Sequence, residues 1–187
     1  ALNVGSDMDS ENILANATND NIRIFLEPTY PYGQTGTQPY DPTYDVQGAY
    51  WGSGNDKGAV NKTSAVAYAF AKKLQSQLNV PVAVLNTPIG GTVIEGWLPR
   101  EAIQGDAKEL EKRGLYYEED FWSDTAGTMS TLYNQKIGPI TNYSIAGAIW
   151  YQGESNSGRS EIYDRELSLL KKSWSEKFGF ENNSMPF

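Results

Sequence analysis

Two short segments carry residues that could stabilise negative charge as it develops on a substrate. Asn-Thr-Pro-Ile-Gly-Gly-Thr occupies positions 86–92, and its glycine pair lets the backbone turn sharply and leaves an N–H free to point at a ligand. Trp-Tyr-Gln-Gly-Glu-Ser-Asn occupies positions 150–156, where Gln152 offers an amide N–H and Glu154 a carboxylate that could fix a neighbouring group. Each segment alone also fits a common turn or a polar capping loop.

The chain of 187 residues contains no histidine and no cysteine. Histidine is the usual general base and a frequent zinc ligand, so any reaction that depends on it must be completed by residues outside this sequence. There is no phosphate-loop pattern and no metal-ligand spacing, so no cofactor is expected. Glu95, Asp124 and Glu154 could be combined into a carboxylate pair for glycoside hydrolysis, but scattered acids are usually solvated and this interpretation is disfavoured.

The elements that must position the two segments are strands. Residues 82–86 and 145–150 are apolar runs of the kind that form strands buried on both faces of a parallel sheet. Residues 22–26 alternate and predict a further strand. Ligands bind at the carboxyl ends of parallel strands, which is where both polar segments begin.

Helical patterns separate these strands. Thr63 or Ser64 can cap a helix that Asn79 ends, and its apolar residues recur every four positions, at Val66, Phe70, Leu74 and Leu78. Residues 160–178 predict a long amphipathic helix that ends at Gly179. The alternation predicts an α/β fold, a three-layer α/β/α domain with a parallel sheet. Residues 185–187 look like a strand cut short, so 1–187 is interpreted as a single partial domain.

Residues 28–62 show no regular period and are rich in Gly, Pro, Tyr, Asp and Asn. A loop of this length is usually functional or flexible. We expect an ordered loop that faces the substrate, because it carries aromatic residues that could stack on sugar rings: Tyr30, Tyr32, Tyr40, Tyr44, Tyr50 and Trp51. The alternative is a mobile surface excursion.

The net charge of −8 is spread along the chain without a basic stripe. Binding to nucleic acid or to an anionic membrane surface is therefore not expected. No stretch reaches 18 consecutive apolar residues, and the N-terminus has neither a basic nor an apolar region of the kind found in signal peptides.

Four segments, in this order, resemble the sialate O-acetylesterase family of SGNH-type hydrolases, which is itself similar to the acetyl xylan esterases. They are residues 64–71, 80–97, 133–139 and 150–156, and the last run is the most specific of them. The resemblance covers most of the chain. It implies an SGNH hydrolase (flavodoxin-like) fold and a carbohydrate esterase.

The family's machinery implies a mechanism. A serine in a Gly-Gln-Ser-Asn-Met-like motif attacks the acetyl carbonyl, and a histidine in a late Asp-x-x-His motif acts as base and then as acid. The serine N–H, a glycine N–H and an amide side chain hold the oxyanion. Gly91 matches that glycine, Gln152 is our choice for the amide, and Glu154 matches the family's Gln-Gly-Glu position.

The sequence departs from the family's pattern at both motifs, because neither is present. Gly-Ser-Asp-Met at 5–8 is a degenerate copy, but only about 15 residues separate Ser6 from Ile22, which is too few for the family's spacing. We therefore interpret Ser6 as a decoy. The nucleophile and the base are expected outside this chain, which alone should be inactive.

The leading hypothesis is an esterase that removes O-acetyl groups from sugars, with sialic acid O-acetyl esters as the substrate. A non-catalytic sugar-binding domain of the same fold and an acetyl xylan esterase stay open as alternatives. The expected partner is an acetylated sugar, and a second chain carrying the missing C-terminal part is also considered. The resemblance alone implies an extracellular or periplasmic location.

Overall fold

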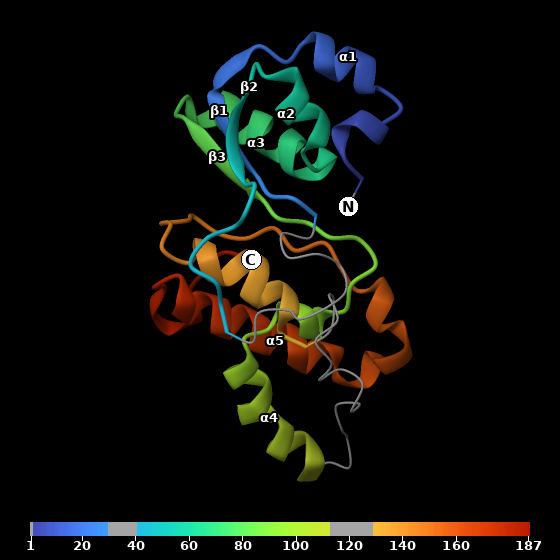
Figure 1. Cartoon of the computed structure of the whole chain (residues 1–187), viewed down its shortest axis with the longest axis vertical. Coiled ribbons are helices and arrows are strands. Elements are labelled where there is room, and N and C mark those ends of the chain that lie inside the picture. Colours follow the sequence, from blue (N-terminus) through green and yellow to red (C-terminus); the bar gives the residue numbers. More distant parts are fainter. Residues whose placement is uncertain (1, 30–40, 113–128) are drawn as a thin grey trace. The chain divides into compact units, whose positions relative to one another are not determined.

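The computed structural model describes residues 2–29, 41–112 and 129–187 (Figure 1). The chain forms two compact units, which are described separately. The first unit is Ala1–Thr29 with Gln47–Gly90, and the second is Tyr30–Val46 with Gly91–Phe187. The single partial domain expected from the sequence stays a prediction.

The first unit holds a small sheet and the helices that pack on it. Its elements, in chain order, are the short 3₁₀ helix η1 (Val4–Ser6), α1 (Ser10–Ala15), β1 (Asn19–Leu26), β2 (Tyr50–Gly54), α2 (Lys57–Lys62), α3 (Ala65–Leu78) and β3 (Val82–Asn86).

The sheet has the strand order β2-β1-β3. β1 runs parallel to β3, with Ile22 opposite Val82 and Leu26 opposite Asn86. β1 runs antiparallel to β2, so the described sheet is mixed rather than purely parallel. The predicted α/β class is confirmed, and the parallel β1–β3 pair, joined through α2 and α3, is its characteristic unit.

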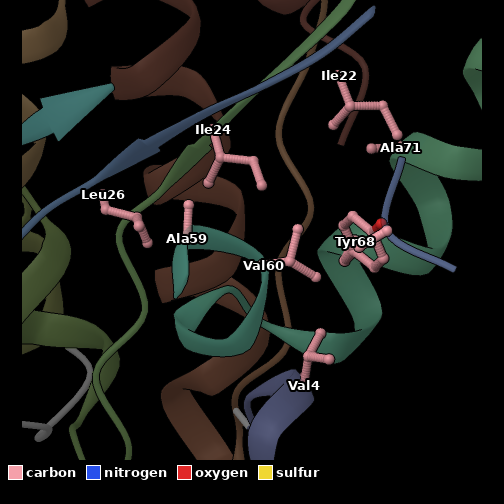
Figure 2. Close-up of a cluster of buried hydrophobic side chains, with 9 residues drawn as sticks. Val4, Ile22, Ile24, Leu26, Ala59, Val60, Tyr68 and Ala71 are labelled. Atoms are coloured by element: carbon pink, nitrogen blue, oxygen red, sulfur yellow. The ribbon is translucent and has the colours of Figure 1, made fainter. Parts of the chain in front are cut away.

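The core of this unit lies between β1 and the helices α2 and α3. Ile22, Ile24 and Leu26 alternate along β1 and therefore share one face of the strand. Figure 2 shows these side chains near residues of the helices, and the buried cluster is made of Val4, Ala17, Ile22, Ile24, Leu26, Ala59, Val60, Tyr68 and Ala71. On the opposite face of β1, Phe25 packs against Trp51 with ring centroids 5.3 Å apart.

The ends of α3 are as the sequence predicts. The Ser64 hydroxyl accepts a hydrogen bond from the N–H of Ala67, and Asn79 adopts the left-handed conformation at φ 53°. The buried face of the helix is different from the predicted one. Tyr68, Ala71 and Gln75 face inward, whereas three of the four residues in the apolar stripe are exposed: Val66, Phe70 and Leu78.

β3 was predicted to be buried on both faces, and this is wrong for the described structure. Only Asn86 of this strand is buried. β3 lies at the edge of the sheet, and among the described residues no strand pairs with its outer side. An edge strand is covered on fewer sides than a central one, which explains its exposure.

The second unit is built of helical segments joined by extended chain. Its elements are η2 (Ile94–Trp97), α4 (Arg100–Lys112), the π-helix η4 (Tyr133–Ile137), η5 (Gly138–Ile140), η6 (Glu154–Arg159), α5 (Ser160–Lys177) and η7 (Glu181–Asn183). The predicted long helix is confirmed as α5, and Gly179 follows it at φ 77°. In the described residues no helix has the length and apolar character needed to cross a membrane.

Residues 145–150 were predicted to be a second buried strand, which is wrong here. They have no regular secondary structure, and Ile149 is half-exposed. The N–H of Ala148 donates to the carbonyl of Pro186 at 2.9 Å, but no ladder forms along this segment. Without a paired strand on either side, the apolar sequence is not enough to make a strand.

Aromatic side chains pack α5 against the segments that flank it. Trp150 contacts Trp97, Trp174 and Phe187, with ring centroids 6.0, 5.8 and 6.3 Å away. The indole N–H of Trp174 donates to the Trp97 carbonyl at 3.0 Å. Trp97 and Trp174 are buried, so these rings serve as packing within the second unit rather than as an open surface for sugars.

Residues 28–62, expected to be a long loop, include β2 and α2. Two glycines in β2 explain why its sequence is typical of a loop although the segment forms a strand. A Cβ atom at Gly52 would lie 2.4 Å from the Cβ of Ala59, and one at Gly54 would lie 2.5 Å from the carbonyl oxygen of Asn19. Tyr30, Tyr32 and Tyr40 lie outside the described residues.

Candidate active site

Gly91 has the backbone that the sequence analysis required of an oxyanion donor. Its φ is +72°, a conformation that favours glycine, and a Cβ atom placed there would meet no atom of the described part of the chain within 4 Å. The next residue, Thr92, is buried, and its hydroxyl accepts a hydrogen bond from the indole N–H of Trp97 at 3.1 Å. The turn is thus open at Gly91 and anchored one residue later.

Gln152 is joined to this turn by its side chain. Its amide nitrogen donates to the Thr92 carbonyl at 3.0 Å and to Asn156 Oδ1 at 2.7 Å. Its amide oxygen accepts a hydrogen bond from the Tyr163 hydroxyl at 2.9 Å. A primary amide has two N–H groups, so both donors of Gln152 are used inside the protein.

Glu154 stands apart from this network. It is the first residue of η6, and its side chain is exposed. Within the described part of the chain its carboxylate makes no hydrogen bond or ion pair. The structure therefore brings Gln152 to the Gly91 turn, and it leaves Glu154 at the surface of the same segment.

The carboxylate that does enter the network belongs to Glu95 in η2. Glu95 is fully buried. Its Oε1 atom lies 2.6 Å from Arg159 Nη2 and its Oε2 atom accepts a hydrogen bond from Asn156 Nδ2 at 2.8 Å. The guanidinium group compensates the buried charge, and the amide satisfies the other oxygen.

A second buried carboxyl, that of Glu166 in α5, faces Glu95. Burial raises the pKa of Glu166 to about 9, and the charge of Glu95 and a hydrogen bond shared with it add to this rise. The Arg159 charge opposes the rise, and the charge of Asp106 reinforces it. At neutral pH Glu166 is therefore protonated, beside the Glu95 carboxyl that is paired with Arg159.

The residues set aside in the sequence analysis are also located. Ser6 ends η1, and its hydroxyl donates to Asn3 Oδ1 at 2.9 Å. Ser6 is in the first unit, whereas Gly91, Gln152 and Glu154 are all in the second. Asp124 lies outside the described residues.

Sequence reasoning missed most of the side chains that hold the site. Asn156 was interpreted as a possible capping residue, and Glu95 was considered only as one of several scattered acids. The missing signal is distance: Asn156 and Glu95 are 61 positions apart in the chain and are joined by a hydrogen bond. Spacing within one segment cannot reveal such a pair.

The fold of this chain is also found in a solved structure. The structure is similar to the crystal structure of a carbohydrate acetylesterase from Xanthomonas citri, with a TM-score of 0.77 and 24% sequence identity over 99% of this chain and 37% of that one. At this identity the likeness defines the fold.

The family follows from the sequence match. A family model described as "Carbohydrate esterase, sialic acid-specific acetylesterase" matches residues 53–186, and the chain belongs to this family. Sialate O-acetylesterases from Pongo abelii and Homo sapiens are each 30% identical over 116 residues, which is 62% of this chain and 21% of theirs. The Rattus norvegicus enzyme is 28% identical over 139 residues. The chain thus spans about a fifth of the first two relatives.

Proposed function

We propose that this chain contributes to a carbohydrate esterase that removes O-acetyl groups from sugars, with sialic acid O-acetyl esters as its substrate. The observation that carries the proposal is the match of residues 53–186 to a sialic acid-specific acetylesterase family. The backbone at Gly91 supports it, because an open turn with a positive φ can present an N–H to a developing oxyanion.

The proposed mechanism is that of a serine esterase with a Ser-His-Asp triad. Because the chain contains no histidine, the base is supplied by residues outside this sequence, and we place the nucleophile outside it as well because no Gly-Gln-Ser-Asn-Met-like motif is present. Gly91 donates one hydrogen bond to the oxyanion and Gln152 donates another. For the second, Gln152 shares one of its two N–H groups between its present acceptor, Thr92 or Asn156, and the oxyanion. Glu154, which has no partner among the described residues, is proposed to orient a group supplied from outside this sequence.

The test is acetate release by the full-length natural protein from a 9-O-acetylated sialoside. Gln152→Ala should lower kcat by about 10²–10³, the usual loss for one oxyanion donor. Ser157→Ala, an exposed position in η6, is the matched control and should leave kcat unchanged. An unchanged kcat in Gln152→Ala would remove Gln152 from the site.

The same assay separates the alternatives. No acetate release by the full-length protein, together with measurable binding of the glycan, would identify a non-catalytic sugar-binding domain. Faster release from acetylated xylan than from the sialoside would identify an acetyl xylan esterase. The fold does not decide the substrate, so this comparison is needed.

A further inference from the structure

Asn156 lies at the centre of a hydrogen-bonded chain that ends on the backbone beside Gly91. Its Oδ1 atom accepts from the backbone N–H of Ile94 at 2.9 Å and from Gln152 Nε2 at 2.7 Å. Its Nδ2 atom donates to Glu95 at 2.8 Å. Asn156 is 1% exposed, so these bonds form away from water, where an unmade bond is most costly.

The backbone groups at the two ends of this hydrogen-bond network fix which atom donates and which accepts in each of its bonds. A backbone N–H can only donate, so the atom of Asn156 that faces Ile94 is the oxygen. A backbone carbonyl can only accept, so the atom of Gln152 that faces Thr92 is the nitrogen. Between these ends, Glu95, which is paired with Arg159, accepts from Asn156, and neither amide can rotate without breaking at least two bonds.

The Glu95 carboxylate holds the hydrogen-bond network in place by its charge. It is fully buried and paired with Arg159, whose side chain is 15% exposed. The carboxyl that faces Glu95 from α5, Glu166, is protonated at neutral pH, so it offers a proton rather than a second charge. The Asp106 carboxylate of α4 is in turn paired with Arg165. The negative charge of Glu95 therefore orients the donor groups that contact it, which belong to Arg159 and Asn156.

We propose that Asn156 and Glu95 are positioning residues of the esterase site, which hold the Gln152 amide on the Thr92 carbonyl and thereby set the direction of the backbone at Gly91. Among the described residues no atom lies within 4 Å of a Cβ placed at Gly91, so the bonds of the neighbouring residue Thr92 are the contacts available to restrain this turn. This inference rests on the proposed esterase function.

The experiment is a double-mutant cycle in the full-length natural protein, with a 9-O-acetylated sialoside as substrate. Asn156→Asp keeps the shape of the side chain but places a second acceptor against Glu95. We expect kcat to fall about 10- to 10²-fold, because a small misplacement at a reacting centre has an effect of this size. KM should change little, since Asn156 is buried and its hydrogen bonds are made within the protein.

Adding Glu95→Gln to Asn156→Asp should restore kcat. The amide introduced at position 95 donates to the carboxylate introduced at position 156 and accepts from Arg159, so the net charge and a matched donor and acceptor are re-established. Recovery to within about threefold of the wild-type kcat supports the proposal. A double variant no more active than Asn156→Asp, or an Asn156→Asp variant with wild-type kcat, overturns it.

Two further comparisons keep the test decisive. If Asn156→Asp does not fold, the double variant is compared with Glu95→Gln alone: a higher kcat in the double variant supports the proposal, and an equal or lower one overturns it. If the wild-type protein releases no acetate, the proposed esterase function has failed. That result is read before any variant is made, so the two failures are distinguishable.

Discussion

At the scale of the residue, the buried carboxyl of Glu166 gives the protein a pH-dependent stability. In the unfolded chain this group ionises near its ordinary pKa of 4.5, whereas burial and the charge of Glu95 raise the pKa to about 9 in the folded protein. Below pH 4.5 the group is protonated in both states and imposes no penalty. Between the two pKa values the folded state binds the extra proton, so stability falls as pH rises and the loss is complete above the folded pKa.

Glu166→Gln should remove this pH dependence, because glutamine is neutral at every pH and still carries an N–H donor to face Glu95. The wild-type free energy of unfolding should fall by up to ~1.4 kcal/mol per pH unit within this window, and the variant's should fall less. Near pH 9 the variant should be the more stable protein. Urea unfolding followed by circular dichroism at several pH values measures this.

Glu161→Gln, on the exposed surface of the same helix α5, is the matched control for charge removal. Its stability curve should run parallel to that of the wild type. If the Glu166→Gln curve is also parallel, then Glu166 is ionised in the folded protein, and the account of a protonated partner for Glu95 is wrong.

At the scale of the element, close approach of the backbone explains why β2 contains two glycines. A Cβ atom at Gly54 would lie 2.5 Å from the Asn19 carbonyl oxygen and 3.0 Å from the Ile22 Cβ. Gly54→Ala should therefore lower the free energy of unfolding by about 1–3 kcal/mol through overpacking. Gly105→Ala in α4 is the opposite case, since no atom of the described residues lies within 4 Å of its added Cβ.

The pair of glycine variants provides its own control. Gly105→Ala should raise the free energy of unfolding by about 0.5–1 kcal/mol, because alanine is the better helix former. Chemical denaturation of both variants gives the comparison. Two variants of equal stability would show that the contacts of β2 do not restrict position 54.

The elements also show what local sequence could and could not predict. The caps of α3 at Ser64 and Asn79 and the end of α5 at Gly179 were predicted, because each depends on the conformation of a few neighbouring residues. The buried face of α3 was not predicted correctly. A four-residue period identifies an apolar stripe on a helix, but it does not show which face packs against the rest of the protein. The strand predicted at residues 145–150 was wrong for the same reason. A strand forms only when another strand pairs with it, and the pairing strand is distant in the sequence.

In the candidate site, too, the features that depend on neighbouring residues could be predicted from the sequence, and those that depend on distant residues could not. The sharp turn at the glycine pair could be predicted from the sequence because it depends on neighbouring residues, and Gly91 has the positive φ that such a turn requires. The role of Gly91 at the site stays a prediction. The hydrogen-bond network that joins Gln152 to Glu95 could not be predicted from the sequence. It connects segments about 60 positions apart, and no local motif marks the side chains that take part. Long-range polar contacts of this kind are visible only in the folded protein.

At the scale of the whole molecule, the composition sets a limit on what this chain can do alone. It belongs to a family of carbohydrate esterases, yet it has no histidine and spans about a fifth of its first curated relatives. The serine most like a nucleophile by sequence, Ser6, donates its hydroxyl hydrogen to Asn3 and has no imidazole to activate it. Within this sequence a Ser-His-Asp mechanism therefore lacks its general base.

The isolated 187-residue chain should accordingly show no triad-dependent esterase activity, whereas the full-length natural protein should release acetate. Without a general base the hydroxyl of a serine is a weak nucleophile at neutral pH, and removing a triad member lowers kcat by about 10⁴–10⁶. Both proteins are assayed on p-nitrophenyl acetate and then treated with diisopropyl fluorophosphate, with adducts located by mass spectrometry. An active, pure chain with its adduct on Ser6 would reverse the assignment, because it would place the nucleophile inside this sequence and require a base other than histidine.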